Sequence, residues 1–275
     1  MKTVKKGDIV GRKSYGKDIL FIVERIIKTK EKRSFAILKG LTIRIQADAP
    51  LEDLELIETK RVEQHLRVLE ENFEKRIKKI ENSLKGKLPV REKVIIHTGR
   101  ILHIDGDKKY SEKSFIYYKK IGLNAIVKNI SERKQPSMIG ALVKKYNPEI
   151  IVVTGHDGMI KKGTKFNDIY NYRNSRYFIK AVEEARKQTQ RDNLVIFAGA
   201  CQSYYEGIMM AGANFASSPA RILIDFMDPL IVAEKIAITS EDKFVTIKDF
   251  EDELRDGQRG VSGIGGQGKK KILMI

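Results

Sequence analysis

Short apolar runs separated by glycine, lysine and aspartate fill the first 57 residues of the chain. The runs lie at 9–10, 19–23, 35–38 and 43–45. In the last run, Ile43 and Ile45 alternate with Arg44 and Gln46, as in a strand with one buried and one solvent-facing side. So many short strands in so few residues predict a small SH3-like β-barrel over residues 1–57.

A helical period begins near residue 58. Apolar side chains recur in steps of three and four along one stripe, namely Val62, Leu66, Leu69, Phe73, Ile77, Ile80 and Leu84. The positions between them are mostly charged, so the pattern predicts one long helix with a solvated face. The stripe suits either a dimer seam or a strut packed on the next domain. We favour the strut and interpret residues 58–87 as a helical connector.

From residue 88 onward, apolar runs alternate with helix-like stretches. The strand-like runs lie at 94–96, 101–102, 125–127, 149–153 and 194–197, and the helix-like stretches lie at 114–120, 137–146 and 174–190. The alternation predicts an α/β domain over residues 88–275, with a mostly parallel sheet covered by helices on both faces. Ligands of such sheets bind beyond the carboxyl ends of the strands.

Two of the most apolar runs lead to residues that carry chemistry. The run at 150–153 is followed by His156, and the run at 194–197 is followed by Cys201. Both side chains should therefore lie at the carboxyl edge of the sheet. Either residue alone is more often structural, but the pair favours catalysis. We interpret Cys201 as a nucleophile and His156 as the base that takes its proton and returns it to a leaving amine.

An ordinary thiol is mostly protonated at neutral pH and needs a base or a positive field to react. If a helix begins near Ser203, its N-terminal dipole would lower the pKa of Cys201. Backbone N–H groups of Cys201 and of the loop that carries His156 would stabilise the substrate oxyanion.

Composition narrows the classes of protein. A single cysteine excludes an internal disulfide and a multi-thiolate zinc site, and the four histidines show no H-x-x-x-H spacing. We therefore expect no metal and no cofactor. No apolar run is long enough to span a bilayer, and the N-terminus lacks an apolar signal region. These features predict a cytoplasmic protein with no membrane partner.

The formal net charge of +17 supports an alternative, a non-enzymatic protein that holds nucleic acid or an assembly partner through the basic barrel. The positive surplus is spread along the chain, so we do not favour nucleic acid as a partner. A flavodoxin-like nucleotide-binding protein is a third hypothesis.

The sequence around both motifs resembles known peptidases. A strand ending in a His-Gly signature, and a later strand ending in Ala-Cys, resemble the caspase, clostripain and gingipain group of cysteine peptidases. The segments VVTGHDG and FAGACQSYYEGIMMAGANFASSPARILIDFMDPL, together with the N-terminal barrel, more closely resemble the YabG family of sporulation proteases. The resemblance implies a caspase-like fold and an endopeptidase that cleaves after Arg. It also implies spore coat proteins as substrates and a place in the mother cell or at the spore coat.

Two positions depart from the wider group. Asp157 follows the histidine in place of Gly, and Gly199 stands where clostripain-like enzymes carry an Asp two residues before the cysteine. An acid that binds a substrate Arg must then come from elsewhere. Asp105 and Asp107, just after an early strand, are our candidates, because a carboxylate there would pair with a guanidinium.

Plainer interpretations compete with these assignments. Residues 105–107 also suit a simple Asp-Gly turn, or with Glu112 a calcium site, although the spacing is not that of an EF-hand. His97 and His103 lie near strand ends but lack glycines on both sides, which favours a core or edge histidine. The glycine-rich residues 257–268 lack the order of a phosphate loop and are interpreted as a flexible tail or loop.

Overall fold

The computed structural model describes residues 3–28, 34–85, 94–160, 165–188 and 194–274. The expected boundary between the connector and the α/β part, at 87–88, lies outside these residues, as does the side chain of Leu84.

The first part of the chain folds into a five-stranded antiparallel sheet, here called the N-terminal sheet. Its strands are β1 (Ile9–Arg12), β2 (Phe21–Lys28), β3 (Ser34–Gly40), β4 (Gln46–Pro50) and β5 (Leu54–Leu56), in the order β4-β3-β2-β1-β5. The expected run of short strands is confirmed. Among the described residues β4 and β5 do not pair with each other, so the closed SH3-like barrel is not found.

The expected strand at residues 43–45 is wrong. Strand β4 begins only at Gln46, and the chain turns irregularly between β3 and β4. The N–H of Gly40 donates to the carbonyl of Ile45 over 2.8 Å, which closes a tight turn. A Cβ at Gly40 would lie 2.3 Å from the carbonyl oxygen of Ile43, so only glycine fits. The turn carries Arg44, expected on the solvent side, into a fully buried position.

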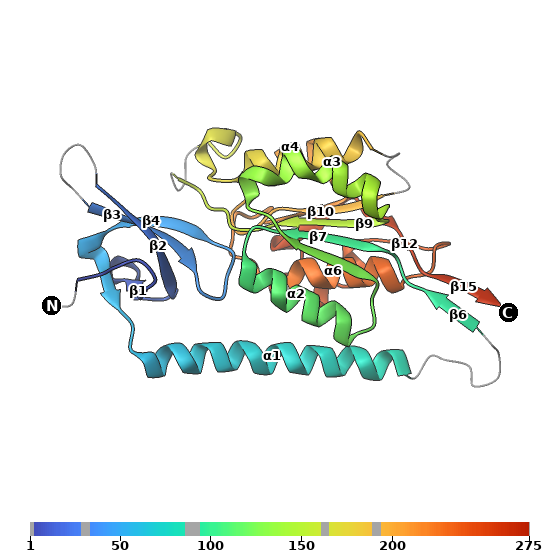
Figure 1. Ribbon diagram of the computed structural model, residues 1–275, viewed down its shortest axis with the longest axis horizontal. Helices are drawn as coiled ribbons and strands as arrows, with labels where there is room; N and C mark the ends of the chain where they lie inside the picture. The colour runs from blue at the N-terminus through green and yellow to red at the C-terminus, as the bar shows by residue number, and fades with distance from the viewer. Residues whose placement is uncertain (1–2, 29–33, 86–93, 161–164, 189–193, 275) are drawn as a thin grey trace.

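A single long helix follows, as the sequence predicts. Helix α1 (Thr59–Lys85) packs on the N-terminal sheet through Val62 and Leu66, and it reaches the core of the second sheet through Phe73 and Ile77. It runs along one side of the molecule in Figure 1. The helix therefore packs on both sheets of the chain.

The second sheet, here called the central sheet, has six strands. They are β7 (Ile101–Asp105), β8 (Ala125–Asn129), β9 (Ile150–Thr154), β10 (Val195–Ala198), β11 (Phe215–Ser217) and β13 (Val261–Gly263). The order is β13-β11-β10-β9-β7-β8, and only β13, which lies against β11, runs antiparallel to its neighbour. Strands β9 and β10 consist of buried residues throughout, as expected when both faces of a parallel sheet are covered. The expected mostly parallel sheet is confirmed.

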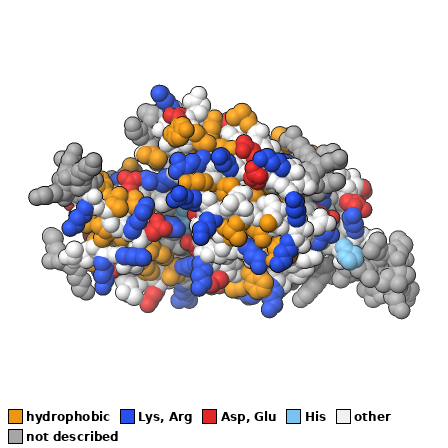
Figure 2. Space-filling view, turned by 45° about the horizontal axis from the view of Figure 1, so that its top comes forward, with side chains coloured by type: hydrophobic (Ala, Val, Ile, Leu, Met, Phe, Trp, Pro, Cys, Tyr) orange, Lys and Arg blue, Asp and Glu red, His pale blue; other side chains and the backbone are white. Residues whose placement is uncertain are grey.

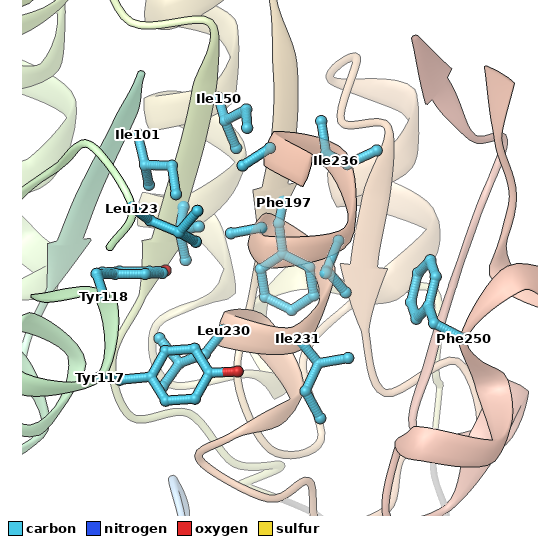
Figure 3. Close-up of a cluster of buried hydrophobic side chains, with 14 of the residues drawn as sticks. Ile101, Tyr117, Tyr118, Leu123, Ile150, Phe197, Leu230, Ile231, Ile236 and Phe250 are labelled. Atoms are coloured by element: carbon cyan, nitrogen blue, oxygen red, sulfur yellow. The ribbon is translucent and has the colours of Figure 1, made fainter. Parts of the chain in front are cut away.

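Helices cover both faces of the central sheet, also as expected (Figure 1). They are α2 (Lys108–Lys120), α3 (Gln135–Tyr146), α4 (Ser175–Arg186), α5 (Tyr205–Met210) and α6 (Asp228–Ile238). Helices α3 and α4 lie on one face, and α2 and α6 lie on the other, next to α1. Figure 3 shows Phe197 of β10 among Leu230, Ile231 and Tyr117 in the second of these cores. Each such side chain contributes about 1.5–3 kcal/mol through burial.

Two short ladders complete the fold. Strand β6 (Val94–His97) pairs with β15 (Lys271–Met274), and β12 (Phe244–Val245) pairs with β14 (Gly266–Gln267), in both cases antiparallel. The run at 94–96 therefore does not join the parallel sheet. The glycine-rich residues 257–268 supply β13 and β14, so interpreting them as a flexible tail was wrong. A Cβ at Gly263 would lie 2.1 Å from the carbonyl oxygen of Asn214, and this contact explains why the edge strand uses glycine.

Positive side chains are scattered over the surface. Figure 2 shows Lys and Arg spread across one whole face and interleaved with hydrophobic and polar groups. None of the helices in the described part of the chain combines the length and apolar character that a bilayer span requires.

Candidate active site

Cys201 and His156 leave the central sheet at the carboxyl ends of neighbouring parallel strands. Val153 of β9 lies opposite Ala198 of β10, and the two loops diverge from there. The hydroxyl of Thr154 donates to the carbonyl of Gly199 over 2.9 Å, which ties the two strand ends together. This placement confirms the expected juxtaposition of the two loops.

Cys201 is completely buried. The backbone N–H of Ile224 donates to its Sγ over 3.3 Å, and the thiol packs in the core beneath the N-terminal sheet. Burial raises the pKa of Cys201 to about 12, although backbone hydrogen bonds from Ile224 and Arg44 favour the thiolate. The expected lowering by a helix dipole is therefore wrong for this conformation. Helix α5 has only six residues, and burial outweighs it.

His156 is also fully buried, and it is held by its backbone. Its N–H donates to Oε1 of Glu132 over 2.7 Å, and its carbonyl accepts from the side-chain amide of Asn174 over 2.7 Å. The imidazole contacts the Tyr110 ring at a centroid distance of 5.8 Å, and neither ring nitrogen has a hydrogen-bond partner among the described residues. Burial lowers the pKa of His156 to about 4, so the ring is neutral in this conformation.

Sequence reasoning missed Glu132. It lies on a 3-10 turn before α3 and is nearly buried, and burial raises its pKa. Cβ atoms at Gly106 and Gly155 would lie 2.2 and 2.4 Å from its Oε1. The two glycines thus make room for Glu132, which fixes the backbone at His156. No local motif marks the residue, because its role arises from a contact 24 residues away.

Asp157 joins the histidine loop to the cysteine loop. Its carboxylate accepts hydrogen bonds from the N–H groups of Gly158 and Asn174 and from the hydroxyls of Ser175 and Ser203. Burial raises its pKa to about 6, although these donors favour the charged form. Asp157, which departs from a bare His-Gly motif, therefore links the histidine loop to the cysteine loop through hydrogen bonds.

Asp105, a predicted substrate-binding residue, lies at the end of β7 and is fully buried. Its Oδ2 lies 2.5 Å from Nη1 of Arg44, whose guanidinium stacks 4.5 Å from the Tyr110 ring centroid. Burial alone would raise the pKa of Asp105, but Arg44 and His103 hold it well below its usual range. The carboxylate is therefore charged and already paired with an arginine of the same chain.

Asp107, the second predicted substrate-binding residue, has a different environment. Its side chain accepts from the N–H of Tyr110 and caps the N-terminus of α2, while its own N–H donates to Oδ1 of Asp105 over 2.8 Å. Asp107 therefore helps to hold the carboxylate of Asp105 in place through a backbone hydrogen bond. The described residues contain no group of His, Cys, Asp and Glu side chains that could hold a metal ion.

Residues 42–46, here called the strap, pair with the loop that carries His156, and Ile45 packs in the same apolar core as Cys201. The N–H of Asp157 donates to the carbonyl of Arg44 over 3.1 Å, and the N–H of Gln46 donates to the carbonyl of Asp157 over 2.8 Å. These bonds form a parallel β-bridge between Ile45 and Asp157. The side chain of Arg173 also donates to the carbonyl of Gln46 over 3.1 Å. The strap is thus joined to the histidine loop by one β-bridge and by the side chain of Arg173.

A groove of about 690 Å³ opens beside the strap. Its lining includes Ile45, Gln46 and Asp48, and also Gln202 and Arg221. Gln202 directly follows Cys201 in the chain.

The rival histidines have different surroundings. His97 is exposed on β6. The buried His103 lies beside Asp105, with its Nε2 3.6 Å from Oδ2 of Asp105 and its Nδ1 3.1 Å from the hydroxyl of Tyr118. Both fit the expected edge and core roles.

Comparison with known proteins identifies the class. A family described as YabG peptidase U57 matches residues 5–274. The chain therefore belongs to the YabG peptidase family and is a peptidase. It is similar to the sporulation-specific protease YabG of Bacillus subtilis (strain 168), with 36% identity over 282 residues, 98% of this chain and 97% of the relative.

Proposed function

We propose that this chain is a cysteine endopeptidase in which Cys201 is the nucleophile and His156 the base, and that it cleaves peptide bonds after arginine. The observation that carries the proposal is the meeting of three features at one sheet edge. His156 follows β9 and Cys201 follows the adjacent strand β10, and the carboxylate of Asp105 lies at the end of the next strand, β7. The Tyr110 ring contacts both His156 and the guanidinium bound to Asp105.

The chemistry would follow from these positions. His156 takes the proton of Cys201, and the sulfur attacks the carbonyl carbon of the substrate arginine to form a tetrahedral oxyanion. The N–H of Asp157 is a donor for that oxyanion, since it already binds the carbonyl of Arg44. Collapse expels the amine, which receives the proton from His156, and leaves a thioester. Water then hydrolyses the thioester with His156 again as base.

Arginine would be selected by Asp105 and Tyr110. A buried carboxylate favours a cation, and a planar guanidinium can stack on the ring while it hydrogen-bonds to the acid, which a lysine ammonium does less well. Asp107 assists by donating its N–H to Asp105. We further propose spore coat proteins as substrates, during sporulation in the mother-cell cytoplasm or at the spore coat. The similarity to a sporulation-specific protease supports that setting.

The test uses the full chain and an arginine-containing peptide library read by mass spectrometry. Cys201→Ala is expected to abolish cleavage, and His156→Ala to lower kcat/KM by about 10²–10⁴-fold. The double variant should be little worse, because the two residues act as one unit. His97→Ala, at an exposed histidine far from the site, is the matched control. Undiminished cleavage by Cys201→Ala would refute the assignment.

A further inference from the structure

Arg44 is bound where a substrate arginine would be. Its side chain is fully buried, which is rare for arginine unless the charge is paired. The guanidinium is held by Asp105 at 2.5 Å and by the Tyr110 ring at 4.5 Å. These are the groups to which the proposed function assigns the recognition of arginine.

The backbone of Arg44 is bound as a substrate backbone would be. Its carbonyl oxygen accepts from the N–H of Asp157, the residue after His156, over 3.1 Å. The next bond, from the N–H of Gln46 to the carbonyl of Asp157, extends the pairing by β-strand addition. The main chain of Arg44 is also one of the groups that favour the charged form of Cys201 and so lower its pKa against the effect of burial.

We infer that the strap, residues 42–46, is a built-in inhibitor that places Arg44 in the arginine pocket and keeps substrates from Cys201 and His156 until it is displaced. The inference rests on the proposed function, because it gives the strap the place of an arginine substrate. Neither Cys201 nor His156 has any exposed surface while the strap is bound.

Side chains from elsewhere in the fold bind both ends of the strap. The hydroxyl of Thr42 lies 2.8 Å from Nε2 of His65 on α1. Beyond Gln46, the guanidinium of Arg173 binds the carbonyl of Gln46 and the carboxylate of Asp48. Because Arg173 is outside the proposed catalytic machinery and partly exposed, it offers a way to loosen the strap without altering the pocket.

Two effects should make the enzyme less active while the strap is bound. Burial raises the pKa of Cys201, so its thiol is less ionised at neutral pH than an exposed thiol. A ligand tethered at an effective concentration on the order of 1 mM would also compete strongly with free peptides. For a pocket that binds such peptides with a Kd of about 0.1 mM, opening should raise kcat/KM by about tenfold.

The experiment compares full-length wild type with Arg44→Ala, Arg44→Lys, Arg173→Ala and the control Arg25→Ala, which changes an exposed arginine of β2. The rate of cleavage of an arginine peptide is expected to rise about tenfold in Arg44→Ala and a few-fold in Arg173→Ala. Arg44→Lys should lie between wild type and Arg44→Ala, and Arg25→Ala should match wild type. Iodoacetamide, which has no arginine side chain, should label Cys201 faster in the same order.

A synthetic peptide with the sequence of residues 41–47 provides a second measurement. It should inhibit Arg44→Ala competitively, and the same peptide with alanine in place of its arginine should not. If Arg44→Ala fails to fold, Arg173→Ala and the peptide assay on that variant still decide the question. If wild type cleaves the peptide and Arg44→Ala and Arg173→Ala cleave it at the same rate, the strap is not an inhibitor, and the proposed function still stands. No cleavage by any variant, despite labelling of Cys201 in Arg44→Ala, would instead overturn the proposed function.

Discussion

Replacing Asp105 with asparagine is expected to destabilise the chain by about 3–5 kcal/mol, because it removes one partner of a buried ion pair. Both Arg44 and Asp105 are fully buried, and their closest N–O distance is 2.5 Å. Nε and Nη2 of Arg44 have no hydrogen-bond partner among the described residues. After the substitution the guanidinium keeps the Tyr110 ring and the charge of Asp107 but loses the carboxylate that contacts it, so most of the compensation for its buried charge is gone.

The measurement is urea unfolding followed by circular dichroism, with every variant in a Cys201→Ala background to prevent digestion of the sample. The double variant Arg44→Met/Asp105→Asn removes both charges and keeps an apolar stem on Tyr110. It should regain much of the lost stability and so show a coupling energy of about 1–3 kcal/mol. Asp252→Asn, at an exposed aspartate, is the control and should change stability by less than about 0.5 kcal/mol.

Two results would refute this reasoning. A loss below about 1 kcal/mol in Asp105→Asn would mean that the guanidinium is not held in a buried site. Strict additivity of the two single variants would mean that Arg44 and Asp105 do not contact each other. Either result removes the physical basis of the arginine pocket and of the strap together.

Three further predictions follow from burial and charge. The contribution of Cys201 to stability should be lost above about pH 9, because its pKa is raised from 9.0 to about 12 and it releases its proton only on unfolding. The contribution of His156 should be lost below about pH 6.5, because its pKa is lowered to about 4 and it takes up a proton only on unfolding, whereas Asp157, with a pKa raised to about 6, acts in the opposite direction there. Thermal melts of wild type and Cys201→Ala across pH check this, and Cys201→Ala should show a smaller decline above about pH 9. Gly199→Ala, at φ 110°, should cost about 1–3 kcal/mol in urea unfolding and reduce peptidase activity, whereas unchanged values would exclude strain there. Arg76→Met removes the partner of two carboxylates and should lower the free energy of unfolding by about 3 kcal/mol. The control Arg67→Met, at an exposed arginine of the same helix, should lower it by less than about 0.5 kcal/mol. Equal losses in urea unfolding would show that these ion pairs do not hold α1 in place.

The parts of the fold that are predictable from sequence are those where one strong physical signal acts alone. Continuous apolar runs suit strands that are buried on both faces of a parallel sheet, and such runs occupy residues 150–153 of β9 and 195–198 of β10. Once those strands are parallel and adjacent, the loops after them must meet at one edge. The positions of His156 and Cys201 therefore follow from the sequence with little further information.

The strap was not predictable in the same way. The alternation of Ile43, Arg44 and Ile45 fits a half-buried strand, and nothing local contradicts that interpretation. Tertiary contacts override this local pattern. Gly40 permits a tight turn, and Asp105, 61 residues away, supplies the charge that makes burial of a guanidinium tolerable. A pattern of period two cannot report a partner at that distance.

The same argument explains how the proposed arginine pocket can do without an acid two residues before the cysteine. Gly199 has φ 110°, and a Cβ there would lie 3.1 Å from Cδ1 of Ile208 and 3.2 Å from Cβ of Ser217, so an aspartate side chain would be strained and crowded. The sheet order β10-β9-β7 brings the end of β7 to the other side of the histidine loop. Asp105 is therefore the carboxylate that can face an arginine whose carbonyl is bound by Asp157. That Arg44 of the same chain already satisfies both contacts is the strongest physical reason to assign the pocket there.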